Sequence, residues 1–406
     1  MAMTINTNVA SINAQRNLGL SGSSLSTSMQ RLSSGLRVNS AKDDAAGLAI
    51  SERMNAQTKG LTVAARNAND GISLAQTAEG ALGKVGDMLQ RVRELAVQSS
   101  NATNSQSDRD AMQSEVNQLV SEIDRVAKTT EFNGKKLLDG SFSGAMFQVG
   151  ANSGDNITLS SVANASAKGL SNISYATDTE TVTAGAAVLN NLVADAGTTL
   201  TIAVNGGTAV NLGPLAEASS AEERMGQVVA AINAKTADTG VTAFLKQDSA
   251  TKVFTVEIMS DNVNADGSSQ AVVLGAGFTA ATTGITVAGT AIAAAGTATA
   301  NQKGIDGIDI GSQSGAWKAL KQVDSAIDQV NSARGDLGAL QTRFEKTVEN
   351  IDIQNENISA AKGRITDADF AVETANLSRA QILQQAGTAM VAQANQLPQS
   401  VLSLLR

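Results

Sequence analysis

Three long stripes of apolar residues at helical spacing constrain the fold of this chain more than any other feature. The first consists of Leu61, Ala65, Ala68, Ile72, Ala75, Leu82, Leu89, Val92 and Ala96. The second consists of Met112, Val116, Leu119, Ile123 and Val126, and the third of Leu320, Val323, Ile327, Val330, Leu337, Phe344, Val348, Ile351, Ile358 and Ile365. Such spacing places side chains on one face of a helix, which needs a partner to be buried. We therefore predict that helices from both ends of the chain pack together as a bundle.

Local signals predict where these helices begin. Ser40 with Asp43, and Ser107 with Asp110, have the spacing of a capping box, in which each side chain bonds a free N–H of the first helical turn. Asn355 stands in register with the third stripe, where a buried Asn costs stability but fixes the register of packed helices.

The middle of the chain, about residues 175–300, is rich in Thr, Val, Gly and Ala and predicts a β-rich domain inserted between the helical arms. The expected elements are a hairpin at Leu200–Val204 and Thr208–Leu212, a helix at Ala221–Lys235, and strands at Val241–Lys246 and Lys252–Met259. A further hairpin is expected at Phe147–Val149 and Ile157–Leu159, after a turn at Asn133-Gly134. The predicted fold class is therefore mainly α with a β insert.

The two extreme ends carry thinner apolar stripes surrounded by Asn, Gln and Ser. They are Ile5, Val9, Ile12, Leu25, Met29, Leu32 and Leu36 at one end, and Leu383, Ala386, Met390, Leu397, Val401 and Leu404 at the other. Burying one such side chain contributes ~1.5–3 kcal/mol, against ~1–2 kcal/mol of backbone entropy for every ordered residue. We expect these ends to be largely unfolded in a single chain and to order against other copies. A head-to-tail contact that does not close gives an open helical polymer. Pro398 should kink or restart the last helix.

Composition excludes several classes of function. The chain has 0 His and 0 Cys, so it has no His- or Cys-based nucleophile and no zinc site built on these residues. We expect no enzyme, no metal and no cofactor. A net charge of -8 argues against nucleic acid and anionic membrane as partners. No apolar run approaches the ~20 residues of a membrane span, and residues 1–20 lack the apolar core of a cleavable signal peptide.

Several long motifs resemble those of bacterial flagellins. They are LSSGLRVNSAKDDAAG at 32–47, RNANDGIS at 66–73, LQRVRELAVQS at 89–99 and LPQSVLSLLR at 397–406. The resemblance covers about residues 1–170 and 305–406, and the stretch from Leu200 to Met259 is similar to a small ββαββ module of flagellin and hook-protein inserts. It implies an extracellular structural subunit of the flagellar filament, active in cell motility and exported unfolded by the flagellar type III system without a cleavable signal peptide.

The resemblance also implies a division of the chain into three parts. Residues 1–40 with 367–406 would form coaxial helices lining the filament lumen, 41–174 with 301–366 a helical bundle, and 175–300 a variable surface domain. The implied partners are other copies of the chain, an export chaperone that covers the C-terminal arm, and the filament cap and hook–filament junction proteins.

Host recognition is implied as well. Gln90, Arg91, Leu95 and Glu115 match positions recognised by the Toll-like receptor for flagellin, although by themselves Arg91 and Glu115 are typical of a solvated face. Leu402, Leu404 and Leu405 match tail leucines recognised by cytosolic immune sensors, and helix packing is their simpler role. Two other classes stay open: a secreted coiled-coil tip or translocator protein of a related export apparatus, and a carboxylate hydrolase in the insert.

Overall fold

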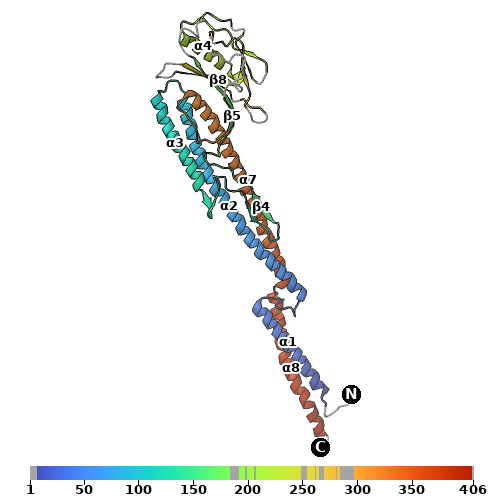
Figure 1. Ribbon diagram of the computed structural model, residues 1–406. Helices are drawn as coiled ribbons and strands as arrows, with labels where there is room; N and C mark the ends of the chain where they lie inside the picture. The colour runs from blue at the N-terminus through green and yellow to red at the C-terminus, as the bar shows by residue number, and fades with distance from the viewer. Residues whose placement is uncertain are drawn as a thin grey trace. The chain divides into compact units, whose positions relative to one another are not determined.

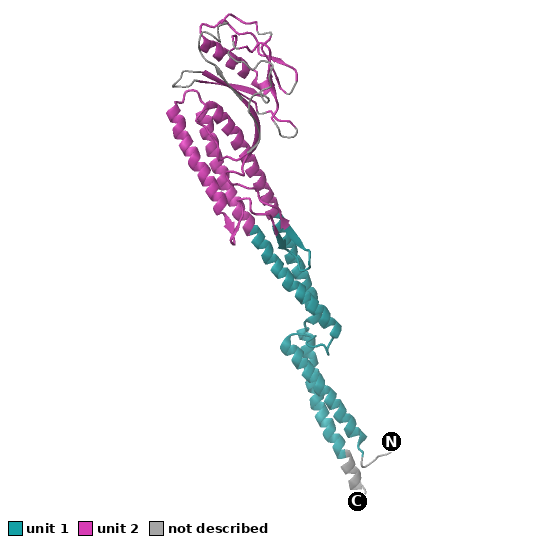
Figure 2. Cartoon of the chain, viewed as in Figure 1, with its two compact units in different colours: residues 1–72, 146–157, 342–406 teal, residues 73–145, 158–341 magenta. Residues whose placement is uncertain are grey.

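The computed structural model describes residues 7–182, 192–196, 199–204, 207–247, 254–260, 262–264, 269–279, 281–283 and 297–404, with side chains outside 178–182, 297–302 and 397–404. The chain divides into two compact units (Figure 2). The first comprises Met1–Ile72, Met146–Ile157 and Thr342–Arg406, and the second comprises Ser73–Ala145 and Thr158–Gln341. Ile5 and Leu405 lie outside the described residues.

The terminal helices of the first unit pair with each other along their length (Figure 1). They are α1 (Val9–Ser34) and α8 (Phe370–Leu404). The Asn8 side chain accepts a hydrogen bond from the backbone N–H of Ser11 and so caps the start of α1. At the other end Gly35 adopts φ 70° and its N–H bonds the Arg31 carbonyl, a left-handed ending that suits glycine. These ends are therefore helical in the structure, whereas the sequence predicts that they are largely unfolded in a single chain; each helix finds a partner in the other.

The remainder of the first unit is built from parts of two long helices and a hairpin. The helices are α2 (Ala45–Ser99) and α7 (Gln313–Thr366), and strands β3 (Ala145–Gln148) and β4 (Asn156–Leu159) pair as predicted. The core here is thin and centres on Leu61, Ala64 and Ile351. Asn355 is half-buried, and its Oδ1 has no hydrogen-bond partner among the described residues.

Both predicted helix starts are displaced. Helix α2 begins at Ala45, and the carboxylate of Asp44 accepts from the N–H of Gly47 at 2.8 Å, while Ser40 and Asp43 form a separate turn before it. Helix α3 (Gln106–Thr129) begins with a capping box, but its members are Ser105 and Asp108. Segments rich in Ser and Asp offer several capping partners, and the neighbouring loop decides which pair is used.

The helices of the second unit confirm the predicted bundle. The stripe residues Ala75, Leu82, Leu89, Val92, Ala96, Val116, Ile123 and Val323 are fully buried. Glu79, which interrupts the stripe of α2, accepts a hydrogen bond from Gln341 Nε2 at 2.8 Å, so its polar head is satisfied beside the core. Arg109 is buried and donates to the main-chain oxygens of Ser99 and Asn101, which fixes the connection between α2 and α3.

Short strands follow the helices. Strands β1 (Glu131–Phe132) and β2 (Lys135–Lys136) pair through the predicted Asn133-Gly134 turn, in which both residues have positive φ. The insert contains a four-stranded sheet in the order β11-β5-β9-β8 and a three-stranded sheet in the order β10-β6-β7. Their bounds are β5 (Asn172–Val182), β6 (Thr201–Val204), β7 (Val210–Asn211), β8 (Val241–Gln247), β9 (Phe254–Ser260), β10 (Val272–Leu274) and β11 (Thr297–Lys303).

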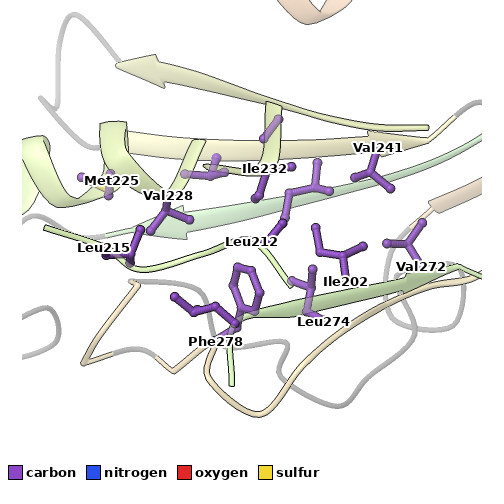
Figure 3. Close-up of a cluster of buried hydrophobic side chains, with 14 residues drawn as sticks. Ile202, Leu212, Leu215, Met225, Val228, Ile232, Val241, Val272, Leu274 and Phe278 are labelled. Atoms are coloured by element: carbon purple, nitrogen blue, oxygen red, sulfur yellow. The ribbon is translucent and has the colours of Figure 1, made fainter. Parts of the chain in front are cut away.

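An apolar core of the insert, formed by described residues, lies between its longer helix and its strands (Figure 3). Helix α4 (Ala221–Asn233) points Met225, Val228 and Ile232 into it, and the short α5 (Thr236–Thr239) leads into β8. The order β6-β7-α4-β8-β9 is the predicted ββαββ arrangement. Strands β5, β10 and β11 were not expected. The expected insert boundaries at 174/175 and 300/301 fall inside β5 and β11, and the three-part division stays a prediction.

Candidate functional site

The inner seam between α1 and α8 is formed by small and polar residues. Ser11, Ser28, Ala380 and Ala394 are buried there. A Cβ built on Gly387 would lie 3.0 Å from Leu18 Cδ1, so the two backbones approach closely at this point. Little apolar area is available in such a seam, and it stabilises the pair only weakly.

Several large apolar residues of the two helices are instead exposed to solvent. Of the predicted stripe, Val9 is 66 % exposed, Ile12 57 %, Met29 56 %, Leu383 50 % and Met390 65 %. Leu25, Leu32 and Leu36 are half-buried. The structure adds residues that the sequence stripe missed, namely Leu20, Phe370, Val372 and Ile382. We call these nine exposed residues the outward face. Large apolar side chains exposed in this number on one helix pair are candidates for an interaction surface.

The far end of the α1–α8 pair is held by polar contacts. Asn8 Nδ2 donates to the main-chain oxygen of Ala394 at 2.7 Å, and Ser11 Oγ donates to Asn395 Oδ1 at 2.6 Å. Beyond them, the backbone of α8 stays helical through Pro398 to Leu404, so the helix does not restart there, and the kink that was the other predicted outcome stays a prediction. Leu397, Val401, Leu402 and Leu404 lie on this helix in the stretch whose side chains are not described, so their roles remain predictions.

The near end of the pair is joined by two connecting segments that bond to each other. The N–H of Arg37 donates to the Thr366 oxygen at 2.7 Å, and the N–H of Ala368 donates to the Gly35 oxygen at 2.9 Å. The Arg37 guanidinium donates from Nη2 to the Ile365 oxygen at 2.7 Å, which satisfies a free carbonyl at the end of α7. These hydrogen bonds therefore hold the segment that follows α1 beside the segment that precedes α8.

The residues matched to receptor recognition lie on α2 and α3 of the second unit. Arg91 Nε donates to Glu115 Oε1 at 2.8 Å, and Arg91 Nη1 donates to Glu94 Oε2 at 3.0 Å. The hydrogen bond to Glu115, followed by that to Glu94, raises the pKa of Arg91. Gln90 is exposed, whereas Leu95 is only 2 % exposed and belongs to the bundle interior. These assignments stay predictions.

Two other kinds of site that a chain can carry are a metal centre and a membrane-spanning helix. Among the described residues no group of His, Cys, Asp and Glu is arranged to hold a metal ion. In the same part of the chain, no helix combines the length and the apolar character that crossing a lipid bilayer requires. The described residues offer instead a set of exposed apolar side chains on the paired terminal helices.

Exposed apolar residues on paired terminal helices are typical of a structural protein subunit. Family models match the bacterial flagellin N-terminal helical region at residues 5–143, the C-terminal helical region at 320–405, and the flagellin hook IN motif at 199–257. The chain is 40% identical to the B-type flagellin of Pseudomonas aeruginosa and to flagellin C of Vibrio cholerae, with 100% of each chain covered. The chain belongs to the bacterial flagellin family.

A solved structure, FliC from Burkholderia pseudomallei, is 28% identical and covers 67% of this chain and 99% of its own, with a TM-score of 0.41. Flagellins are structural proteins of the extracellular flagellar filament and are not enzymes. The predicted family, fold class and non-enzymatic role are therefore confirmed.

Proposed function

We propose that this filament subunit is exported unfolded by the flagellar type III system and is then built into the filament through the outward face of α1 and α8. The observation that carries the proposal is the exposure of Val9, Ile12, Leu383 and Met390 on helices whose inner seam is small and polar. A filament is made of many copies of one chain, so a second copy is the partner that can cover this face.

Assembly is coupled to ordering in this account. The α1–α8 seam alone contributes little against the backbone entropy of two helices of 26 and 35 residues. When a neighbouring copy covers the outward face, each large side chain that becomes buried stabilises the ordered helices by ~1.5–3 kcal/mol. The helices are therefore held firmly only when neighbouring copies supply the second wall.

Seeded polymerisation tests the proposal. Full-length chain added to filament fragments should grow long filaments, and variants lacking residues 1–40 or 370–406 should keep a folded second unit yet fail to grow. Ile12→Asp and Leu383→Asp should also fail, because each would bury a charge against a neighbour. Val193→Asp is the matched control, since Val193 is 69 % exposed on the insert. Normal growth of both arm variants would disprove the proposed surface.

The remaining partners follow from the family resemblance and are proposals too. We place the export chaperone on the C-terminal arm, the filament cap and the hook–filament junction proteins at the two ends of the polymer, and host Toll-like receptor contacts near Arg91 and Glu115. The exposed ion pair of these two residues supports the last proposal, because it displays a defined pattern of charge. Export is tested by following secretion of the variant lacking residues 1–40, which should accumulate inside the cell.

The family match speaks against the alternative of a tip or translocator protein of a related export apparatus.

A further inference from the structure

The free end of the α1–α8 pair carries an interlocked set of polar contacts. Asn8 accepts from the Ser11 N–H at 3.1 Å while its own Nδ2 donates to the Ala394 oxygen at 2.7 Å. The Ser11 hydroxyl donates to Asn395 Oδ1 at 2.6 Å. We call Asn8, Ser11, Ala394 and Asn395 the polar clasp. Ser11 is only 5 % exposed, so its hydroxyl would lose its partner at a cost if the helices shifted.

The rest of the seam specifies the axial register of the two helices poorly. On α8 the small residues Ala380, Gly387 and Ala394 recur at seven-residue intervals. Leu18 packs against Gly387 in the structure, and a slip by one heptad, about 10 Å along the axis, would set it against another small residue at little cost. The paired connectors, bridged between Leu36 and Asp367, hold the register at one end only.

Register matters because the outward face is made by both helices. Val9 and Ile12 lie on the same turns of α1 as the clasp, and Met390 lies one turn from it on α8. A slip of α8 by one heptad would move Met390 and Leu383 by about 10 Å along the axis relative to Val9 and Ile12 on α1. The outward face would then no longer match the corresponding face of another copy.

We propose that Ser11 and Asn395 are positioning residues that fix the register of α1 against α8 and so align the outward face for a second copy of the chain. The inference rests on the proposed assembly function. The Ser11–Asn395 contact would act as a buried Asn does in a coiled coil, where a polar residue fixes the register of the helices at a cost in stability.

The experiment combines seeded growth with cross-linking in the finished filament. Asn395→Leu and Ser11→Ala should slow growth roughly fivefold, the factor expected for one lost, partly buried hydrogen bond. Ser11→Thr keeps the hydroxyl and should grow normally. Ser21→Ala is the matched control, because the Ser21 hydroxyl bonds the Asn17 oxygen of its own helix.

Register is measured with paired cysteines, which are clean probes because the chain has 0 Cys. A Cβ built on Gly387 would lie 3.7 Å from Leu18 Cβ, within the range of a disulfide. Leu18→Cys with Gly387→Cys should cross-link in otherwise unchanged filaments, and Leu18→Cys with Ala380→Cys should not. Adding Asn395→Leu should lower the first yield and raise the second.

The register proposal is overturned if Asn395→Leu and Ser11→Ala grow normally and cross-linking stays confined to positions 18 and 387. In that case the assembly surface still stands, provided that Ile12→Asp blocks growth. Normal growth of Ile12→Asp overturns the assembly surface itself.

Discussion

Gly71 lies directly against the ring of Phe344, and a Cβ built on this glycine would come within 2.7 Å of Phe344 Cζ. Phe344 is fully buried, and its ring meets that of Phe147 edge-on at a centroid distance of 5.4 Å. The packing of Phe344 of α7 against α2 therefore depends on a residue without a side chain, and Phe147 of the β3–β4 hairpin packs on the same ring.

Gly71→Ala should destabilise the first unit. Alanine normally favours a helix over glycine by up to ~1 kcal/mol, but here the methyl group would push Phe344 off its partner and cost ~1–3 kcal/mol. Gly80→Ala is the matched control, since a Cβ on Gly80 has nothing within 4 Å and should stabilise α2. Urea unfolding followed by circular dichroism measures both, and equal upward shifts of the two midpoints would contradict the packing.

Arg37→Ala should loosen the connection between the long helices and the terminal pair. The variant removes the donor to the Ile365 oxygen and leaves the backbone bonds from Arg37 to Thr366 and from Ala368 to Gly35 unsupported. Hydrogen exchange at residues 37 and 368 should become faster, while exchange in the second unit stays the same. Unchanged exchange rates at both amides would show that the Arg37 guanidinium does not stabilise this connection.

The start of α3 should weaken in acid. Hydrogen bonds from the Ser105 side chain and then its N–H hold the pKa of Asp108 below its ordinary value. The folded pKa is the lower one, so this stabilisation is complete above the unfolded value of about 4 and is lost as pH falls through the folded pKa. Asp108→Asn should unfold with a flatter pH dependence in that window. An NMR titration that finds an ordinary pKa for Asp108 would refute the assignment.

Lys318 should hold the insert to the first turns of α7. Its Nζ lies 3.0 Å from Glu257 Oε1, both side chains are mostly buried, and the ammonium sits 5.4 Å from the centre of the Tyr175 ring. Burial raises the pKa of Glu257, but hydrogen bonds from Ser314 and Lys318 outweigh it and the net shift is downward.

Lys318→Met leaves the partly buried Glu257 without its cation and should destabilise the insert by roughly 1–2 kcal/mol. Adding Glu257→Gln should restore much of the loss, because the unpaired charge is removed. The chain has 1 Trp, and Trp317 lies beside Phe244 of the insert, so its fluorescence reports this contact during urea unfolding. Equal midpoints for Lys318→Met and the unchanged chain would contradict the prediction.

Much of the fold follows from apolar spacing because Leu, Ile and Val make the packing faces of α2, α3 and α7. The same is true of α4, β8 and β9 in the insert. Strand β5 was missed because Asn172–Val182 is mostly polar and its partners, β9 and β11, lie about 80 and 120 residues further along the chain. Long-range pairing decides such a strand more than its own sequence does.

The assembly surface could be predicted only in part. The thin terminal stripes indicated association, and Val9, Ile12 and Met390 are exposed as that requires. The division into an inner seam and an outward face could not be predicted from the sequence. The seam residues Ser11, Ala380 and Gly387 are too small or too polar to form an apolar stripe. Only the pairing of α1 with α8 shows which side of each helix is already occupied.

Hydrogen exchange of α1 and α8, compared between single subunits and filaments, tests the central claim most directly. If neighbouring copies supply the missing wall, amides of Val9–Ser34 and Phe370–Leu404 exchange rapidly in the single subunit and become strongly protected in the filament. The bundle helices should be protected in both. Equal protection of the terminal helices in the two states would contradict the account.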